Sequence, residues 1–165
     1  MADLHGFMNV PRQEAERRPV EERVQDWKEV YPGGPGHALL PIITDQASRC
    51  MDCGVPFCHT GCPLGNLIPD WNDLIWRDEW REALSCLQTT NNFPEFTGRL
   101  CPAPCETACV EGLNRAPVTI KNVEVAIIDK AWEDRRVIPV VPEWHSLKTA
   151  AVVGSGPAGL ATAQQ

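Results

Sequence analysis

The sequence lacks the features that mark membrane-spanning, secreted and nucleic-acid-binding proteins. No stretch approaches the roughly 18 consecutive apolar residues that a transmembrane helix needs. The first 30 residues include five charged side chains between positions 12 and 18, and they contain no apolar run of the kind found in a secretory signal. Adjacent basic residues are limited to Arg17-Arg18 and Arg135-Arg136, and the net charge is −7. We therefore expect a cytoplasmic protein that binds neither membranes nor nucleic acids.

Large apolar side chains are also scarce, whereas cysteine is abundant. Leu, Ile, Val and Phe together make up only 38 of the 165 residues, close to the level below which a chain cannot build a packed core. Eight residues are cysteine. Because cytoplasmic thiols stay reduced, a cysteine cluster there is more often metal-binding or catalytic than disulfide-bonded. The composition thus predicts a fold that depends on its cysteines as well as on its core.

Apolar periodicity predicts a mainly helical chain. Helical spacing is found over residues 19–30, 42–49, in two pieces between 70 and 90, and from 120 to about 133, where Thr119 is a candidate cap. Two prolines in residues 137–147 indicate an extended linker, and residues 149–153 have the pattern of a short buried strand. We therefore predict a helical domain over residues 1–146 and the start of a second domain at 147–165.

Seven of the eight cysteines fall into two closely spaced groups. The first group reads Cys50-x2-Cys53-x4-Cys58-x3-Cys62-Pro63, and the second reads Cys101-x3-Cys105-x3-Cys109. Bacterial ferredoxins bind 4Fe-4S clusters with a similar C-x2-C-x2-C-x3-C-P run, whose last cysteine serves the other cluster. The middle gap is two residues longer here. The spacing predicts two 4Fe-4S clusters.

Structural zinc is the alternative. Zinc sites usually present two separated pairs at C-x2-4-C spacing, and the second cysteine group does not divide naturally into pairs. Two 4Fe-4S clusters would need eight ligands, one more than the two groups supply.

Glu124 and Cys86 are the candidates for the eighth ligand. At 100° per residue, Glu124 lies inside the apolar stripe that also carries Val123 and Ile127. A carboxylate there is costly without a partner, which could be iron or a basic side chain. Cys86 lies beside an apolar helix face and is better interpreted as a small buried hydrophobic residue.

A glycine-rich motif follows the predicted strand and opens a predicted helix. It consists of Gly154, Ser155, Gly156, Pro157, Ala158 and Gly159. In this context, such glycines let a pyrophosphate approach the N-terminus of the helix. A complete βαβ unit needs about 30 residues, more than follow Ala150. We therefore expect an incomplete Rossmann-type α/β domain.

Four segments carry a resemblance to a known family: residues 50–58 (CMDCGVPFC), 62–71 (CPLGNLIPDW), 90–106 (TNNFPEFTGRLCPAPCE) and 117–124 (PVTIKNVE). They resemble the small (beta) subunits of bacterial NADPH-dependent glutamate synthases, and the helical two-cluster module of dihydropyrimidine dehydrogenase is related. The resemblance implies that NADPH reduces FAD in the small subunit. Electrons then pass through 4Fe-4S clusters to FMN in the large (alpha) subunit, which forms L-glutamate from glutamine and 2-oxoglutarate.

The resemblance also implies roles for individual residues. It assigns one cluster to Cys50, Cys53, Cys58 and Cys109, and the other to Cys62, Cys101, Cys105 and Glu124. The non-cysteine ligand of the family follows shortly after a Pro-x-x-Ile stretch, here residues 117–120. The glycine motif becomes the FAD site, and the NADPH site lies in a later segment absent from this chain, so the fragment alone is expected to be inactive.

Two other interpretations stay open. The same module occurs in NADPH–ferredoxin transhydrogenases and pyrimidine dehydrogenases. A non-enzymatic zinc-binding interaction module is the alternative from a different class.

Overall fold

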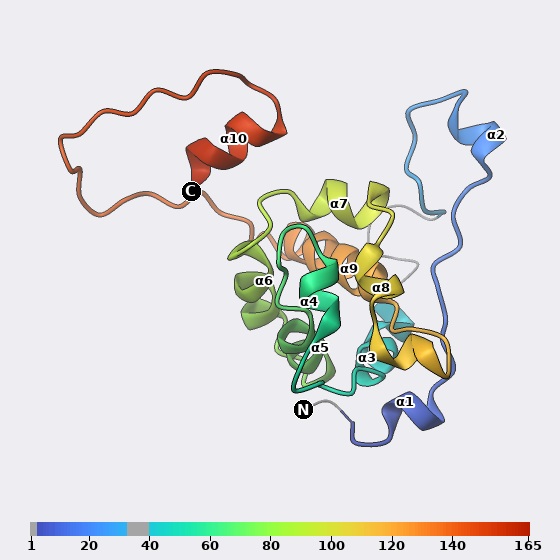
Figure 1. Cartoon of the computed structure of the whole chain (residues 1–165). Helices are drawn as coiled ribbons and strands as arrows, with labels where there is room; N and C mark the ends of the chain where they lie inside the picture. Colours follow the sequence, from blue (N-terminus) through green and yellow to red (C-terminus); the bar gives the residue numbers. More distant parts are fainter. Residues whose placement is uncertain (1–2, 33–39) are drawn as a thin grey trace.

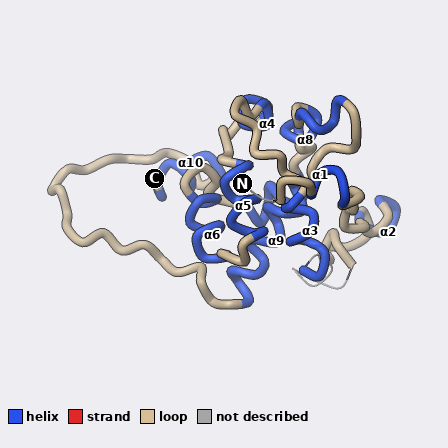
Figure 2. The backbone as a smooth tube through the Cα atoms, turned by 90° about the horizontal axis from the view of Figure 1, so that it is seen from below, coloured by secondary structure: helices blue, strands red, loops and turns tan. Residues whose placement is uncertain are grey.

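A computed structural model describes residues 3–32 and 40–165 of the chain. Figure 1 shows a body of packed helices, with an N-terminal arm along one side and a C-terminal extension on the other. No strand is formed within the described residues, so the helical prediction for the body is confirmed (Figure 2).

Helix α9 (Ile120–Glu133) is the centre of the body. It contacts α3 (Leu40–Ser48), α5 (Ile68–Trp76), α6 (Trp80–Gln88) and α7 (Pro94–Leu100). Every residue from Ile120 to Asp129 is buried, so the helix is covered on all sides rather than along one stripe. The predicted bounds of this helix are confirmed, as are the two helical pieces between residues 70 and 90.

Thr119 does not cap α9 with its side chain. Its hydroxyl instead donates a hydrogen bond of 2.9 Å to the carbonyl oxygen of Gln13, in the N-terminal arm. Thr119 thus occupies the predicted N-cap position of α9, but it makes no side-chain capping bond because its hydroxyl binds the arm instead.

The two cysteine groups lie in segments that contain short helices. These are α4 (Phe57–Gly61), α8 (Pro104–Thr107) and a 3-10 turn, η1 (Val110–Leu113). The sequence predicts only a loop over residues 50–62, and α4 is too short to show a hydrophobic period. Helices α4 and α8 pack side by side (Figure 1).

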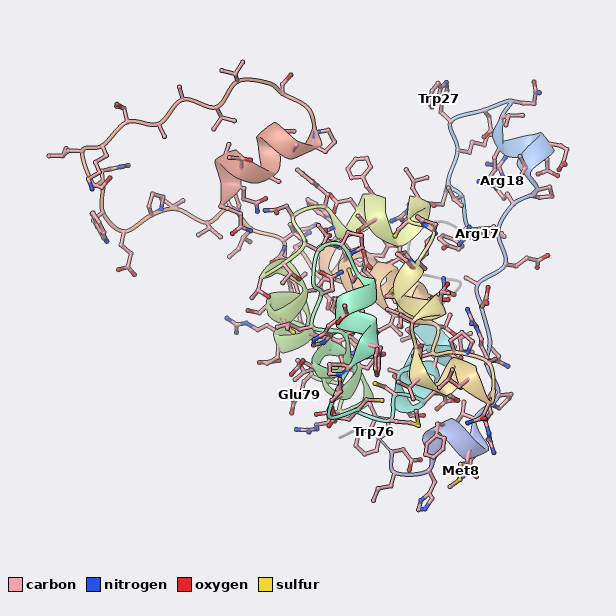
Figure 3. The ribbon with its side chains drawn as sticks, viewed as in Figure 1. Met8, Arg17, Arg18, Trp27, Trp76 and Glu79 are labelled. Atoms are coloured by element: carbon pink, nitrogen blue, oxygen red, sulfur yellow. The ribbon has the colours of Figure 1, made fainter. Side chains whose placement is uncertain are left out.

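The N-terminal arm contains α1 (Gly6–Asn9) and α2 (Val20–Arg23), and the predicted helix over residues 19–30 is only one turn long. Trp27 at the end of the arm is fully exposed and lies away from the helical body (Figure 3). Arg18 donates hydrogen bonds to both carboxylate oxygens of Asp26 and to the carbonyl of Glu29. A short helix needs tertiary packing to persist, and here the chain turns back on itself instead.

The C-terminal extension contains α10 (Pro157–Gln164), the helix predicted to follow the glycine motif. The predicted strand at 149–153 is not formed, and Val153 is 98% exposed. A strand needs a neighbouring backbone to pair with, and the described residues offer none. Helix α10 returns to the body, where Asn92 donates a hydrogen bond of 2.9 Å to Gln164. The division into two domains near residue 147 stays a prediction.

The described part of the chain contains no helix with the length and apolar character needed to cross a membrane.

Candidate metal centre

The first predicted set of ligands lines a single cavity in the body. Cys50 follows α3, Cys53 lies in the next loop, Cys58 belongs to α4, and Cys109 precedes η1, yet all four border the same space. The remaining wall is mainly apolar and includes Ile68 from α5 and Ile120 from α9. The fold therefore brings Cys109 together with the three cysteines of residues 50–58.

The pKa values of three thiols in this set are raised, so that their thiolate forms are unfavourable unless a cation is bound. Burial, together with the neighbouring Cys58, Cys109 and Cys53, raises the pKa of Cys50 to about 12. Burial, followed by Cys109, raises the pKa of Cys58 to about 11. Metal coordination requires thiolates, and a bound metal centre supplies the positive charge that offsets their mutual repulsion. The donor set therefore fits a cationic metal centre.

The second predicted set surrounds Cys105, in α8. Burial raises the pKa of its thiol, and Glu106, Cys62, Glu124 and Cys101 add to that effect in this order. Cys62 follows α4, Cys101 follows α7, and Glu124 belongs to α9. The other three members of the set therefore lie close enough to Cys105 to affect the pKa of its thiol.

A strained turn shapes the second set. Ala103 adopts the left-handed conformation at φ 58°, uncommon for a residue with a Cβ atom. Its backbone N–H lies 3.3 Å from the sulfur of Cys101 and donates a hydrogen bond to it. Strain of this kind persists where surrounding structure demands it and is frequent at functional sites.

Glu124 is buried, as its place in the apolar stripe predicts, with only 6% of the residue exposed. Thr97 and Asn91 donate hydrogen bonds to its Oε1 atom, the latter over 3.1 Å. Burial raises the pKa of Glu124 to about 7, and the two hydrogen bonds moderate that rise. The carboxylate is thus held in one orientation by α7 and the preceding turn.

Cys86 lies apart from both sets. It is half-buried on α6 at the edge of the core, and its sulfur is 4.0 Å from the carbonyl oxygen of Leu67. Burial and Asp70 raise the pKa of its thiol. No cysteine of either group is among the groups acting on it.

Neither set converges on a single metal-binding point. Among the described residues, no three His, Cys, Asp or Glu side chains converge closely enough to hold one metal ion. A zinc ion would need its ligand atoms within about 2.0–2.3 Å of one centre, whereas the thiolates of a 4Fe-4S cube bind separate irons.

The glycine motif lies beside the second set. Ser155, Pro157 and Ala158 border a groove whose other wall includes Phe96 and Cys101. Gly154 has φ 116°, and a Cβ atom on Gly159 would stand 2.3 Å from the Gly154 carbonyl oxygen. Both glycines are therefore required for this turn, in which the loop packs directly on the start of α10.

Two ionic features near the cysteines are not identified by the sequence analysis. Arg49 and Glu111 form a buried ion pair of 2.7 Å, with each side chain 2% exposed. Lys121 lies buried in α9 beside the second set. The sequence could have indicated Lys121, because this residue precedes Glu124 by three positions. Residues at this spacing lie on the same side of a helix.

Comparison with known proteins first shows the class of protein to which the chain belongs. Residues 23–136 match the family model described as dihydropyrimidine dehydrogenase domain II, 4Fe-4S cluster. The chain belongs to this family of 4Fe-4S domains.

Individual relatives are more specific. The chain is 58% identical over its whole length to the glutamate synthase [NADPH] small chain of Mycobacterium tuberculosis strain H37Rv. Identity is 47% to the small chain of Bacillus subtilis over 97% of this chain, and 50% to glutamate synthase [NADH] of Schizosaccharomyces pombe over 98% of it. The resemblance found in the sequence is thereby confirmed. The chain spans 33–34% of the two bacterial small chains and 8% of the yeast protein.

Proposed function

We propose that this chain is the cluster-bearing part of a cytoplasmic glutamate synthase small subunit. In this role, electrons from NADPH pass through FAD and two 4Fe-4S clusters to the large subunit, where L-glutamate is formed. The observation that carries the proposal is the 58% identity over the whole chain to a glutamate synthase small chain. The clustering of the cysteines in the fold supports it.

Each predicted set would hold one cluster. Cys50, Cys53, Cys58 and Cys109 would bind the first cluster, and Cys62, Cys101, Cys105 and Glu124 the second. A 4Fe-4S cluster supplies one-electron storage and transfer, with a potential set by charge, hydrogen bonds and solvent exposure. The first cavity has a mainly apolar wall, and Cys50 is buried in it, whereas Cys53, Cys58 and Cys109 are partly exposed.

Helix α9 contributes to both sites. Ile120 lines the first cavity, and Glu124, one helical turn further on, belongs to the second set. A single rigid helix thus fixes the separation of the two centres. Asn91 and Thr97 hold the Glu124 carboxylate, so that the ligand does not need to be ordered when the cluster binds.

The glycine motif would bind FAD. Gly154, Ser155, Gly156, Pro157, Ala158 and Gly159 would face the pyrophosphate at the N-terminus of α10, where free backbone N–H groups favour negative charge. Ser155 and Pro157 of the proposed FAD site border the same groove as Cys101. The FAD site would therefore adjoin the site proposed for the second cluster. The NADPH site would lie in the part of the protein outside this chain.

Electron transfer to the large subunit tests the proposal. The chain is purified without oxygen, reduced with dithionite, freed of reductant and mixed with the FMN-containing large subunit of a bacterial glutamate synthase. We expect bleaching of the FMN absorption as the chain is reoxidised. A reduced chain that transfers electrons to ferredoxin but not to this subunit would contradict the proposal and favour a transhydrogenase. A chain that holds zinc and no reducible centre would also contradict it.

A further inference from the structure

Lys121 is a buried cation anchored to the second cysteine group. Only 4% of the residue is exposed, and its Nζ atom donates a hydrogen bond of 2.5 Å to the carbonyl oxygen of Cys101. Its backbone N–H donates a second bond, of 2.9 Å, to Oε1 of Glu106, the residue after Cys105. Lys121 is therefore fixed to one proposed cluster ligand, Cys101, and to the residue that follows another, Cys105.

Glu106, which accepts a hydrogen bond from the backbone of Lys121, is shared with a second basic side chain. The other carboxylate oxygen of Glu106 pairs with Arg12 over 2.6 Å, and Arg12 also pairs with Glu14 over 2.5 Å. The pKa of Lys121 is lowered, first by burial and then by Arg17, and the nearby Cys101, Glu106 and Glu124 partly offset this change. Two of the groups that favour its charged form, Cys101 and Glu124, thus belong to the second set.

Burying an ammonium group is costly unless a partner offsets the lost hydration. The hydrogen-bond acceptor of the Lys121 ammonium is a neutral carbonyl oxygen rather than a carboxylate. A cluster with four anionic ligands would supply the missing negative charge. Reduction adds one more negative charge, which a nearby cation stabilises strongly in the protein interior.

We propose that Lys121 is a positioning residue whose positive charge raises the reduction potential of the second cluster. This inference rests on the proposed function, because it requires a cluster held by Cys62, Cys101, Cys105 and Glu124. It assigns the buried lysine to the redox properties of the chain rather than to packing alone.

The test is a redox titration followed by EPR spectroscopy of the anaerobically purified chain. In Lys121→Met, we expect the equilibrium constant for one-electron reduction of one cluster to fall at least about tenfold, a shift of about 59 mV to lower potential. Lys121→Gln keeps a hydrogen-bond donor but no charge and should shift the potential similarly. Lys121→Arg keeps the charge and should stay near the wild-type value.

Lys130 provides the matched control on the same helix. It lies near Asp134, at 3.4 Å, and over the ring of Trp80, so Lys130→Met should leave both potentials unchanged. Iron content is measured first in every sample. A wild-type chain without clusters would contradict the proposed function itself. Fully loaded Lys121→Gln protein with wild-type potentials would overturn the role of Lys121 alone, even if Lys121→Met fails to fold.

Discussion

Gly61, at the end of α4, lies directly against Ala108, which follows α8. A Cβ atom on Gly61 would stand 2.6 Å from the Cβ of Ala108 and 3.3 Å from the carbonyl oxygen of Pro104. Real Cβ atoms do not approach each other so closely, so one of the two segments would have to move. Cys62 comes next in one segment, and Cys105 and Cys109 lie in the other. This contact therefore sets how the two cysteine groups meet.

Gly61→Ala should separate the two cysteine segments. We expect a loss of stability of about 1–3 kcal/mol, typical of overpacking, and a lower iron content per chain. Gly54→Ala is the matched control, because no atom lies within 4 Å of a Cβ at that position. The measurements are urea unfolding and iron analysis. Equal iron content and stability in the two variants would show that the contact does not set the geometry.

Glu124→Ala tests the proposed non-cysteine ligand. If the carboxylate binds iron, the variant should lose iron from one cluster or change the EPR spectrum of that cluster. Cys86→Ser should keep the wild-type iron content and spectrum, because Cys86 lies away from both sets. The reverse pattern would make Cys86 the eighth ligand and leave Glu124 as a buried hydrogen-bonded carboxylate.

Arg49→Met tests the buried ion pair next to the first set. The Glu111 carboxylate would lose its cation while remaining buried, a change that typically costs about 3–5 kcal/mol. Arg49 also donates hydrogen bonds to the carbonyls of Ala116 and Pro117, which would be lost. Arg77→Ala removes the exposed partner of Asp73 and should change stability by about 0.5 kcal/mol or less. Urea unfolding that gives both variants the same stability would contradict this account.

Arg99→Met should release the N-terminal arm. Arg99 pairs with Glu29 of the arm at 3.0 Å and with Asp129 of α9 at 2.9 Å, so it joins the arm to the centre of the body. We expect the variant to be cleaved by protease near residues 20–30 several times faster than the wild-type chain. Arg136→Met, which removes a partly exposed partner of Asp134, is the control. Unchanged cleavage of Arg99→Met would mean that other contacts hold the arm.

The central part of the fold is predictable from the sequence because its helices are long enough to show a period. Helix α9 has the predicted bounds, and α5, α6 and α10 lie where their patterns place them. The cysteine spacing also identifies the two cysteine groups, whereas their division into two ligand sets follows from the resemblance and stays a prediction. These features are encoded locally.

Other features depend on contacts between distant segments. The apolar residues of 19–30 have a helical period, but Val20, Val24 and Trp27 stay exposed and Arg18 holds the chain in a turn. Helix α7 begins at Pro94, directly after residues 91–93. The Asn-Asn-Phe-Pro sequence at this point favours a break in helical structure rather than the start of a helix. The network from Arg12 through Glu106 to Lys121 spans more than 100 residues of sequence, so no local pattern could predict it.

The most direct test of the account is the metal content of the anaerobically purified chain. Iron, acid-labile sulfide and zinc are measured per chain, and Mössbauer spectroscopy identifies the type of cluster. Two 4Fe-4S clusters predict about eight iron and about eight sulfide per chain, in two distinguishable 4Fe-4S environments. About two zinc ions per chain, with neither iron nor sulfide, would contradict the account and make the chain a zinc-binding module.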